Sequence, residues 1–234
     1  MKKIFLFFIS ILFVVSAFCQ SEKKDANQKF VSLVSPTGGG YVFYLPDGNM
    51  YDKNKIDGSP YIFENWQSGV VYFKKNELSS DYKFNYNSYL DQVEFIKDNE
   101  HLMITNKKDI DHIKFGEKDF YYLLFVKNDD KIISGYLDKL VEGKIILYKR
   151  YKCSLLENSN NYTITAGDVI DKFDQDTEYY ISKDSKPAFK IKTNNRKLFN
   201  VFDSNKELVK EYIKNINVRN EKDLIKLFEY YNSL

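Results

Sequence analysis

Short strand-like segments joined by short links run through most of this chain and limit the folds that it can adopt. Residues 82–86 (YKFNY) alternate aromatic with polar side chains, the period of two expected of a strand with one buried face. Aromatic and β-branched runs recur at residues 41–45, 69–73, 113–115, 120–126, 132–137, 144–152, 179–182 and 188–193. Strands joined by links as short as 183–186 pair antiparallel, because parallel neighbours need a crossover of about a dozen residues.

These segments predict a mainly β fold, with an antiparallel meander of about ten strands over residues 30–193. A sheet of that length tends to curl or to split into two layers, so we expect it to form a barrel or a sandwich.

The hydrophobic period changes after residue 193. Ser204 and Glu207 have the spacing of a capping box, in which the hydroxyl accepts a backbone N–H and the carboxylate reaches back. Two apolar helical stripes follow, Leu208, Val209, Tyr212, Ile213 and Ile216, and then, after a cap at Asn220, Leu224, Leu227, Phe228 and Tyr231. We predict that residues 194–234 form a helical segment with an αα-hairpin docked on the β domain. Docking on another protein is the alternative.

Residues 1–19 indicate export. Two lysines precede an apolar run, and the small residues Ala17 and Cys19 stand just before Gln20, the order found in a secretory signal peptide. The run is shorter than the roughly 20 residues that span a bilayer as a helix. We predict cleavage between Cys19 and Gln20, a flexible linker at 20–29, and a mature chain in the periplasm, at the cell surface or outside the cell, with no transmembrane segment.

The two cysteines carry different predictions. A lipid anchor on Cys19 is the alternative to cleavage, although a lipobox requires a small residue where Phe18 stands. Cys153 is the one cysteine left after cleavage, which excludes an intramolecular disulfide, and we expect a half-buried, unreactive thiol.

The mature chain has almost no net charge. Loss of Lys2 and Lys3 lowers the 35 Lys and Arg residues to 33, equal to the 33 Asp and Glu residues. Nucleic-acid-binding proteins usually carry a clear positive excess, so we expect no nucleic-acid partner.

No catalytic motif with a defined mechanism is present: the chain has no G-x-S-x-G, no H-E-x-x-H and no phosphate-binding glycine loop before a helix. We predict no cofactor. Whether the protein is an enzyme is left open, with the balance against it.

Three carboxylates, Asp171, Asp174 and Asp176, cluster before a predicted strand and are candidate calcium ligands, with a solvated loop as the alternative. Residues 52–58 resemble a calcium loop but are one residue out of register.

His112 follows two carboxylates, but on a strand Asp109 and Asp111 would share one face and His112 the other, which predicts no local acid–base pair. A zinc site formed with His101 across a hairpin would lack a third ligand.

Trp66 is the sole tryptophan in a chain in which 17% of the residues are aromatic. In strands, aromatic residues usually form the core and cross-strand pairs, so Trp66 is expected to be a packing anchor. The alternative is a platform on which a ligand such as a sugar stacks.

Several spaced motifs resemble a pattern in exported Bacteroidetes proteins for which no function is assigned. The motifs are Trp66-x-x-Gly69-x-Val71, Phe84-Asn85-Tyr86-Asn87, Ile113-x-Phe115, Phe120-Tyr121, Gly143-x-Ile145-x-Leu147-Tyr148-Lys149 and the ending from Asp223-Leu224 to Tyr230-Tyr231-Asn232. The resemblance covers most of residues 60–234. It implies a lineage, and it defines no catalytic residue.

These observations favour an exported, non-catalytic binding or accessory protein of the bacterial cell envelope, whose partner is another envelope protein or a glycan. Two alternatives stay open. One is a carboxylate-dependent hydrolase acting on a sugar polymer, and the other is a barrel that carries a lipid or small ligand.

Overall fold

The structure is a computed structural model, and it describes residues 42–44, 50–52, 56–74, 77–97, 100–105, 107–127, 130–157 and 171–234. The predicted signal peptide, its cleavage site at Cys19 and Gln20 and the linker at 20–29 lie outside these residues. The described part is mainly β with a helical C-terminal segment, as predicted. Its strands are β1 (Val42–Tyr44), β2 (Met50–Asp52), β3 (Ile56–Asp57), β4 (Gln67–Phe73), β5 (Glu77–Asn87), β6 (Gln92–Lys97), β7 (Glu100–Met103), β8 (Ile110–Phe115), β9 (Lys118–Val126), β10 (Ile132–Val141), β11 (Ile146–Leu156), β12 (Asp171–Ser182) and β13 (Ala188–Ile191), and its helices are α2 (Asn195–Phe199), α3 (Lys206–Lys214) and α4 (Glu221–Ser233).

Five of the strands pair in a closed circuit, which we call the ring. Each strand from β9 to β13 pairs antiparallel with the next, and β13 returns to β9 as a parallel neighbour. An up-and-down circuit with an odd number of strands has to place its first and last strands parallel. The predicted meander is therefore present from β8 to β13, but it is interrupted before β8, which pairs with β4 and not with β7. The parallel closure of the ring makes the sheet mixed rather than wholly antiparallel.

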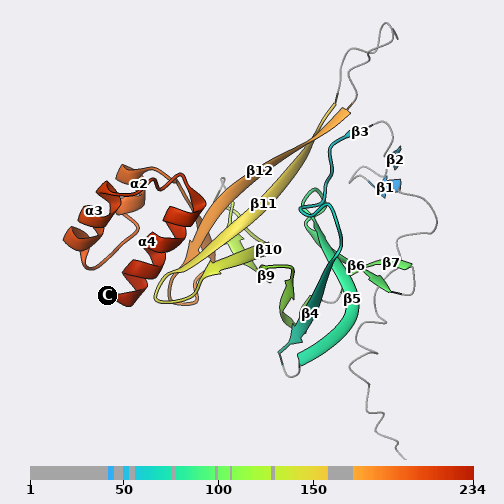
Figure 1. The fold of residues 1–234 in the computed structure, drawn as a ribbon, viewed down its shortest axis with the longest axis horizontal. Coiled ribbons are helices and arrows are strands. Elements are labelled where there is room, and N and C mark those ends of the chain that lie inside the picture. The colour runs from blue at the N-terminus through green and yellow to red at the C-terminus, as the bar shows by residue number, and fades with distance from the viewer. Residues whose placement is uncertain are drawn as a thin grey trace, which may run out of the picture. The chain divides into compact units, whose positions relative to one another are not determined.

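A second branch, which we call the wing, leaves from the start of β9 and consists of β4–β8. β9 pairs with β8, β8 with β4, and the path continues through β5 and β6 to β7, with antiparallel pairing throughout (Figure 1). The path ends at β7 instead of returning to its start. The described strands of the ring and the wing therefore form one large sheet that is not a clean barrel.

The interior of the ring is filled by side chains. Each of its five strands contributes one buried residue to a single cluster, composed of Phe125, Leu137, Tyr148, Tyr180 and Ala188. The rings of Phe125 and Tyr180 meet edge to face with centroids 5.2 Å apart, a favourable aromatic geometry. A ring of so few strands is narrow, and one layer of such side chains fills it.

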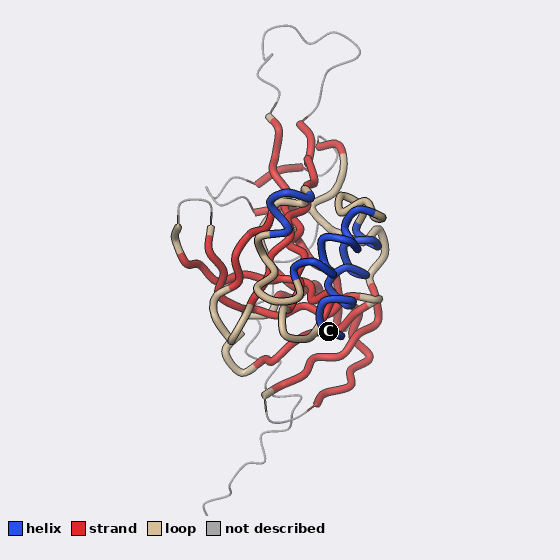
Figure 2. The backbone as a smooth tube through the Cα atoms, turned by 90° about the vertical axis from the view of Figure 1, so that its left-hand side faces the viewer, coloured by secondary structure: helices blue, strands red, loops and turns tan. Residues whose placement is uncertain are grey.

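The C-terminal helices pack on the end of the ring where β10 ends and β11 begins (Figure 1). In Figure 2 the helices, in blue, lie together in front of the strands. They share a core cluster with the strands: Val141, Ile145, Leu147, Ile181 and Ile191 come from the ring, and Leu198, Phe202, Val209, Ile213, Val218, Leu224, Leu227, Phe228 and Tyr231 come from the helical segment. Because helices this short are marginal in isolation, most of their stability comes from this packing.

The predicted helix caps have different outcomes. The Asn220 side chain accepts hydrogen bonds from two backbone N–H groups in the first turn of α4, which confirms that cap. The capping box predicted at Ser204 and Glu207 is wrong, because α3 begins after Asn205, whose side chain makes no capping bond. The Ser204 hydroxyl instead pairs with the Tyr231 hydroxyl of α4, 3.1 Å away.

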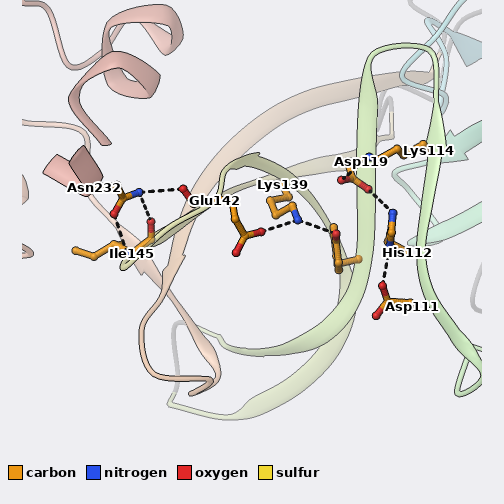
Figure 3. Close-up of polar contacts among 9 residues, drawn as sticks. Asp111, His112, Lys114, Asp119, Lys139, Glu142, Ile145 and Asn232 are labelled. Atoms are coloured by element: carbon orange, nitrogen blue, oxygen red, sulfur yellow. Dashed lines mark hydrogen bonds and ion pairs between the residues drawn. The ribbon is translucent and has the colours of Figure 1, made fainter. Parts of the chain in front are cut away.

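Asn232, in the last turn of α4, ties that helix to the β10–β11 hairpin (Figure 3). Its side-chain oxygen accepts a hydrogen bond from the backbone N–H of Ile145 at 3.0 Å, and its amide donates to the carbonyls of Ile145 at 2.9 Å and Glu142 at 3.2 Å. Gly143 in the same hairpin has a φ of 151°, and a Cβ there would come within 2.4 Å of the Asn232 amide. The hairpin loop therefore requires glycine to accept the helix.

Candidate functional site

Trp66 lies in the loop before β4, and the fold brings two further rings to it. Its indole meets the His101 ring of β7 edge to face, with centroids 4.8 Å apart, and lies 5.7 Å from the ring of Tyr61. Tyr61 and His101 are themselves 6.4 Å apart, so the three rings form one cluster. Trp66 is half-buried, so it both packs against neighbours and keeps part of its surface in solvent.

A buried carboxylate completes this group, which we call the Trp66 cluster (Tyr61, Trp66, Asn87, Glu94 and His101). The Glu94 side chain is 6% exposed, whereas that of its neighbour His101 is 40% exposed. One oxygen of Glu94 accepts a hydrogen bond from the Tyr61 hydroxyl at 2.7 Å and contacts the His101 Nε2 atom at 2.5 Å. The other accepts from the Asn87 amide at 3.0 Å. Both carboxylate oxygens are therefore occupied.

Burial and the charge of Glu94 together raise the pKa of the Tyr61 hydroxyl above its usual value. The hydroxyl therefore stays protonated and donates to Glu94 throughout the physiological pH range. Neighbouring donors thus satisfy the buried charge, as an interior carboxylate requires.

Hydrogen bonds from β5 fix the loop that carries Trp66. The buried Asn85 side chain accepts from the backbone N–H of Phe63 at 3.3 Å and donates to its carbonyl at 2.9 Å. The buried Ser88 hydroxyl donates to the Pro60 carbonyl at 2.8 Å. The rings of the cluster therefore stand on an ordered loop, which lowers the entropy lost when a ligand binds.

A second cluster surrounds His112, where β4, β8 and β9 run side by side (Figure 3). The imidazole is stacked between the rings of Tyr72 and Tyr121, with centroid distances of 4.2 Å and 4.9 Å. Its Nδ1 atom lies 2.8 Å from the Asp111 carboxylate, and its Nε2 atom lies 3.8 Å from that of Asp119. A carboxylate thus faces each nitrogen of the imidazole.

The prediction that Asp111 and His112 would point apart is wrong because the strand is irregular there. Tyr72 pairs with His112 and Phe73 with Ile110, so Asp111 is an extra residue in β8. Side chains do not alternate across such a β-bulge, and adjacent residues can reach each other.

Charged groups extend the His112 cluster on both sides. Burial raises the pKa of Asp119, against the lowering effect of His112 and Lys114. Burial alone would lower the pKa of Lys139, but its hydrogen bonds to Glu142 and to the Tyr121 hydroxyl, both 2.7 Å long, raise it. Lys139 therefore stays charged, and its ammonium group lies over the Tyr121 ring, 4.4 Å from the centroid, in a cation–π contact.

The remaining predicted sites are placed as follows. Asp171, Asp174 and Asp176 lie on β12, where alternation puts Asp171 on one face and the other two on the opposite face. His101 and His112 belong to separate clusters. Within the described residues, no group of three or more His, Cys, Asp or Glu side chains has the arrangement of a metal site. Part of the 52–58 segment lies outside the described residues.

The thiol of Cys153 is half-buried, and burial raises its pKa to about 11. At neutral pH it is therefore protonated, the unreactive form of a cysteine. This agrees with the expectation from the sequence.

The comparisons with known proteins found no protein-family model, curated protein or solved structure significantly similar to this chain. Across the described residues, every helix is too short or too polar to cross a membrane.

Proposed function

We propose that this chain is an exported, non-catalytic binding or accessory protein of the bacterial cell envelope, and that the Trp66 cluster binds a glycan. The observation that carries the proposal is the joining of three rings to a buried, hydrogen-bonded carboxylate on an ordered loop. The predicted signal peptide at residues 1–19 supports the proposed location, and the motifs that resemble those of exported Bacteroidetes proteins support the proposed lineage.

The chemistry of the cluster suits a sugar. Binding sites for small ligands combine aromatic surface with a few fixed polar groups. Trp66 is half-buried and the His101 side chain is 40% exposed, so aromatic surface at both positions reaches solvent next to the buried carboxylate. The aromatic faces match the C–H faces of a pyranose.

The same geometry favours binding over hydrolysis. A general acid or base has to reach the reacting atom directly or through one water molecule. In the Trp66 cluster, Glu94 is buried and its two oxygens already receive Tyr61, His101 and Asn87. The filled interior of the ring likewise favours binding at the surface over carriage of a ligand inside.

The test is binding of the purified protein to a panel of soluble envelope and plant polysaccharides, measured by affinity electrophoresis and calorimetry. We expect at least one polysaccharide to bind, and Trp66→Ala to weaken that binding about tenfold or more. Phe189→Ala, which removes an aromatic side chain from the surface of β13, is the matched control and should bind as the wild type does.

Two outcomes would overturn the proposal: no binding to any member of the panel, or equal binding by the wild type and Trp66→Ala. Release of new reducing ends from the bound polysaccharide would contradict the non-catalytic part and favour the hydrolase.

A further inference from the structure

A surface hollow of about 390 Å³ lies beside the ring, and its lining shares no residue with the Trp66 cluster. Strand β12 contributes residues 176–179, β13 and the turn after it contribute 190–194, and Arg219 reaches it from the turn before α4. Strands and the α3–α4 turn together thus form a concave site.

Glu178 has the more buried of the two carboxylates in the lining, and its charge is already balanced by cations. Although burial opposes its charge, hydrogen bonds from Lys190, Lys152 and the Tyr180 hydroxyl lower the pKa of Glu178 to about 2. The two ammonium groups lie 2.7 Å and 3.1 Å from one of its oxygens. Glu178 therefore stays charged and is balanced by two lysines.

Asp176 is the other acidic residue of the lining, and it lies at the exposed surface. Its carboxylate accepts a hydrogen bond from the backbone N–H of Thr177 at 2.7 Å. Among the described residues, the Asp176 carboxylate is the only one in the lining that forms no ion pair with a lysine or an arginine.

Three cations at this site are left without a carboxylate partner. Lys192 and Arg219 line the hollow, and Lys197 of α2 approaches Lys192 closely enough to lower the pKa of its ammonium group. None of the three forms an ion pair with a carboxylate of the described chain. Like charges so close together repel, and an anion between them would remove that repulsion.

We propose that the hollow binds a small tetrahedral oxyanion, a phosphate or sulfate group, held by Lys192 and Arg219 of the lining, with Lys197 beside Lys192 as a further positive charge. Thr193 lies in the same lining and adds an uncharged polar group, whereas the side-chain oxygen of Asn194 is already used to cap α2. The proposal does not depend on glycan binding at the Trp66 cluster, because the two sites share no residue.

Isothermal titration of the full chain with inorganic phosphate, and separately with sulfate, at low ionic strength tests the proposal. We expect saturable one-site binding of at least one of the two anions. The double variant Lys192→Gln/Arg219→Gln should weaken binding about tenfold or more, because each lost contact is a charge-assisted hydrogen bond. If only one anion binds, the site distinguishes phosphate from sulfate, and if both bind, it recognises a tetrahedral oxyanion of either kind.

The matched control is Lys210→Gln/Lys214→Gln, which removes the same charge from the exposed face of α3. It should bind phosphate or sulfate like the wild type, and so should Trp66→Ala. Absence of saturable binding of both anions would overturn the proposal. Equal binding by the wild type and Lys192→Gln/Arg219→Gln would also overturn it. So would a loss of binding in Lys210→Gln/Lys214→Gln as large as that in Lys192→Gln/Arg219→Gln, because it would indicate only diffuse attraction to surface charge.

Discussion

The ring and the wing meet at β9, and both have buried aromatic and polar side chains, but the polar ones have different partners. In the ring, the buried Asp138 and Glu178 carboxylates form ion pairs with lysines of neighbouring strands. In the wing, the buried Asn85 and Glu94 side chains instead bond to the loop that precedes β4. The comparison teaches that buried polar groups join strands to one another in the ring, whereas in the wing they order the surface loop that carries Trp66.

The largest effect is expected where the helices cover the ring. Phe228→Ala removes a fully buried ring from the core cluster and should lower the free energy of unfolding by about 3–5 kcal/mol. Leu208→Ala on α3, where the side chain is 50% exposed, should change it by less than about 0.5 kcal/mol. Urea denaturation measures both.

Two probes separate the branches in that experiment. Trp66 is the sole tryptophan, so its fluorescence reports on the wing, whereas far-ultraviolet circular dichroism at the helical band reports on α2–α4. We expect both transitions to move together in Phe228→Ala, because β9 of the ring pairs directly with β8 of the wing. A Trp66 transition that stays in place while the helical one moves would show that ring and wing unfold independently.

The next effect is expected in the wing. A Cβ on Gly69 would lie 2.3 Å from the Lys114 carbonyl oxygen and 2.5 Å from the Phe115 Cβ, next to a register shift between β4 and β5. Gly69→Ala should therefore lower the free energy of unfolding by about 1–3 kcal/mol through overpacking. The Trp66 fluorescence transition should shift to a lower urea concentration. Ser68→Ala, at the exposed neighbouring position, should leave that transition unchanged.

The smallest of the three effects is a pH dependence in the ring. The pKa of Glu178 is about 2 in the folded protein and near 4.5 when unperturbed, so its stabilising effect is complete above about pH 4.5 and is lost as the pH falls toward 2. Solvent screens the partly exposed lysines and weakens the effect. We therefore expect the free energy of unfolding to fall by on the order of 2 kcal/mol in acid.

Glu178→Gln should remove that part of the acid sensitivity, and the exposed Glu229→Gln on α4 should retain it. The measurement is urea denaturation at neutral pH and at about pH 3. An acid-induced loss of the same size in Glu178→Gln would show that other groups cause it.

Local patterns in the sequence predicted local structure well. The strand at residues 82–86, the stripe of α4 and the Asn220 cap all depend on neighbours within one or two turns, and all three are confirmed. The predicted single buried face of that strand is wrong, because Asn85 is buried as well as Phe84, and Leu208 of the predicted α3 stripe is 50% exposed.

The Ser204 capping box failed because a distant side chain, Tyr231, takes the hydroxyl. The parallel return of β13 to β9 and the bulge at Asp111 depend on pairing register, which no local period encodes.

The candidate sites were harder to predict from the sequence for the same reason. Trp66 could be singled out as an unusual residue, but its neighbours Glu94 and His101 come from two later strands. Glu178 has Arg150 directly opposite on β11, and Lys190 comes from a third strand. Only the strand order brings such residues together, and that order depends on contacts far apart in the chain.

Closure of the ring also limits the order in which the chain can finish folding. The strands that follow β9 can pair one after another, but the circuit stays open until Ala188 and Phe189 reach the end of β9. The end of the ring is covered only when α4 docks, because Leu224, Leu227 and Phe228 of that helix belong to the shared core cluster. A chain cut by a protease before α4 would therefore keep paired strands but expose the apolar residues that α4 covers, the kind of species on which chaperones act.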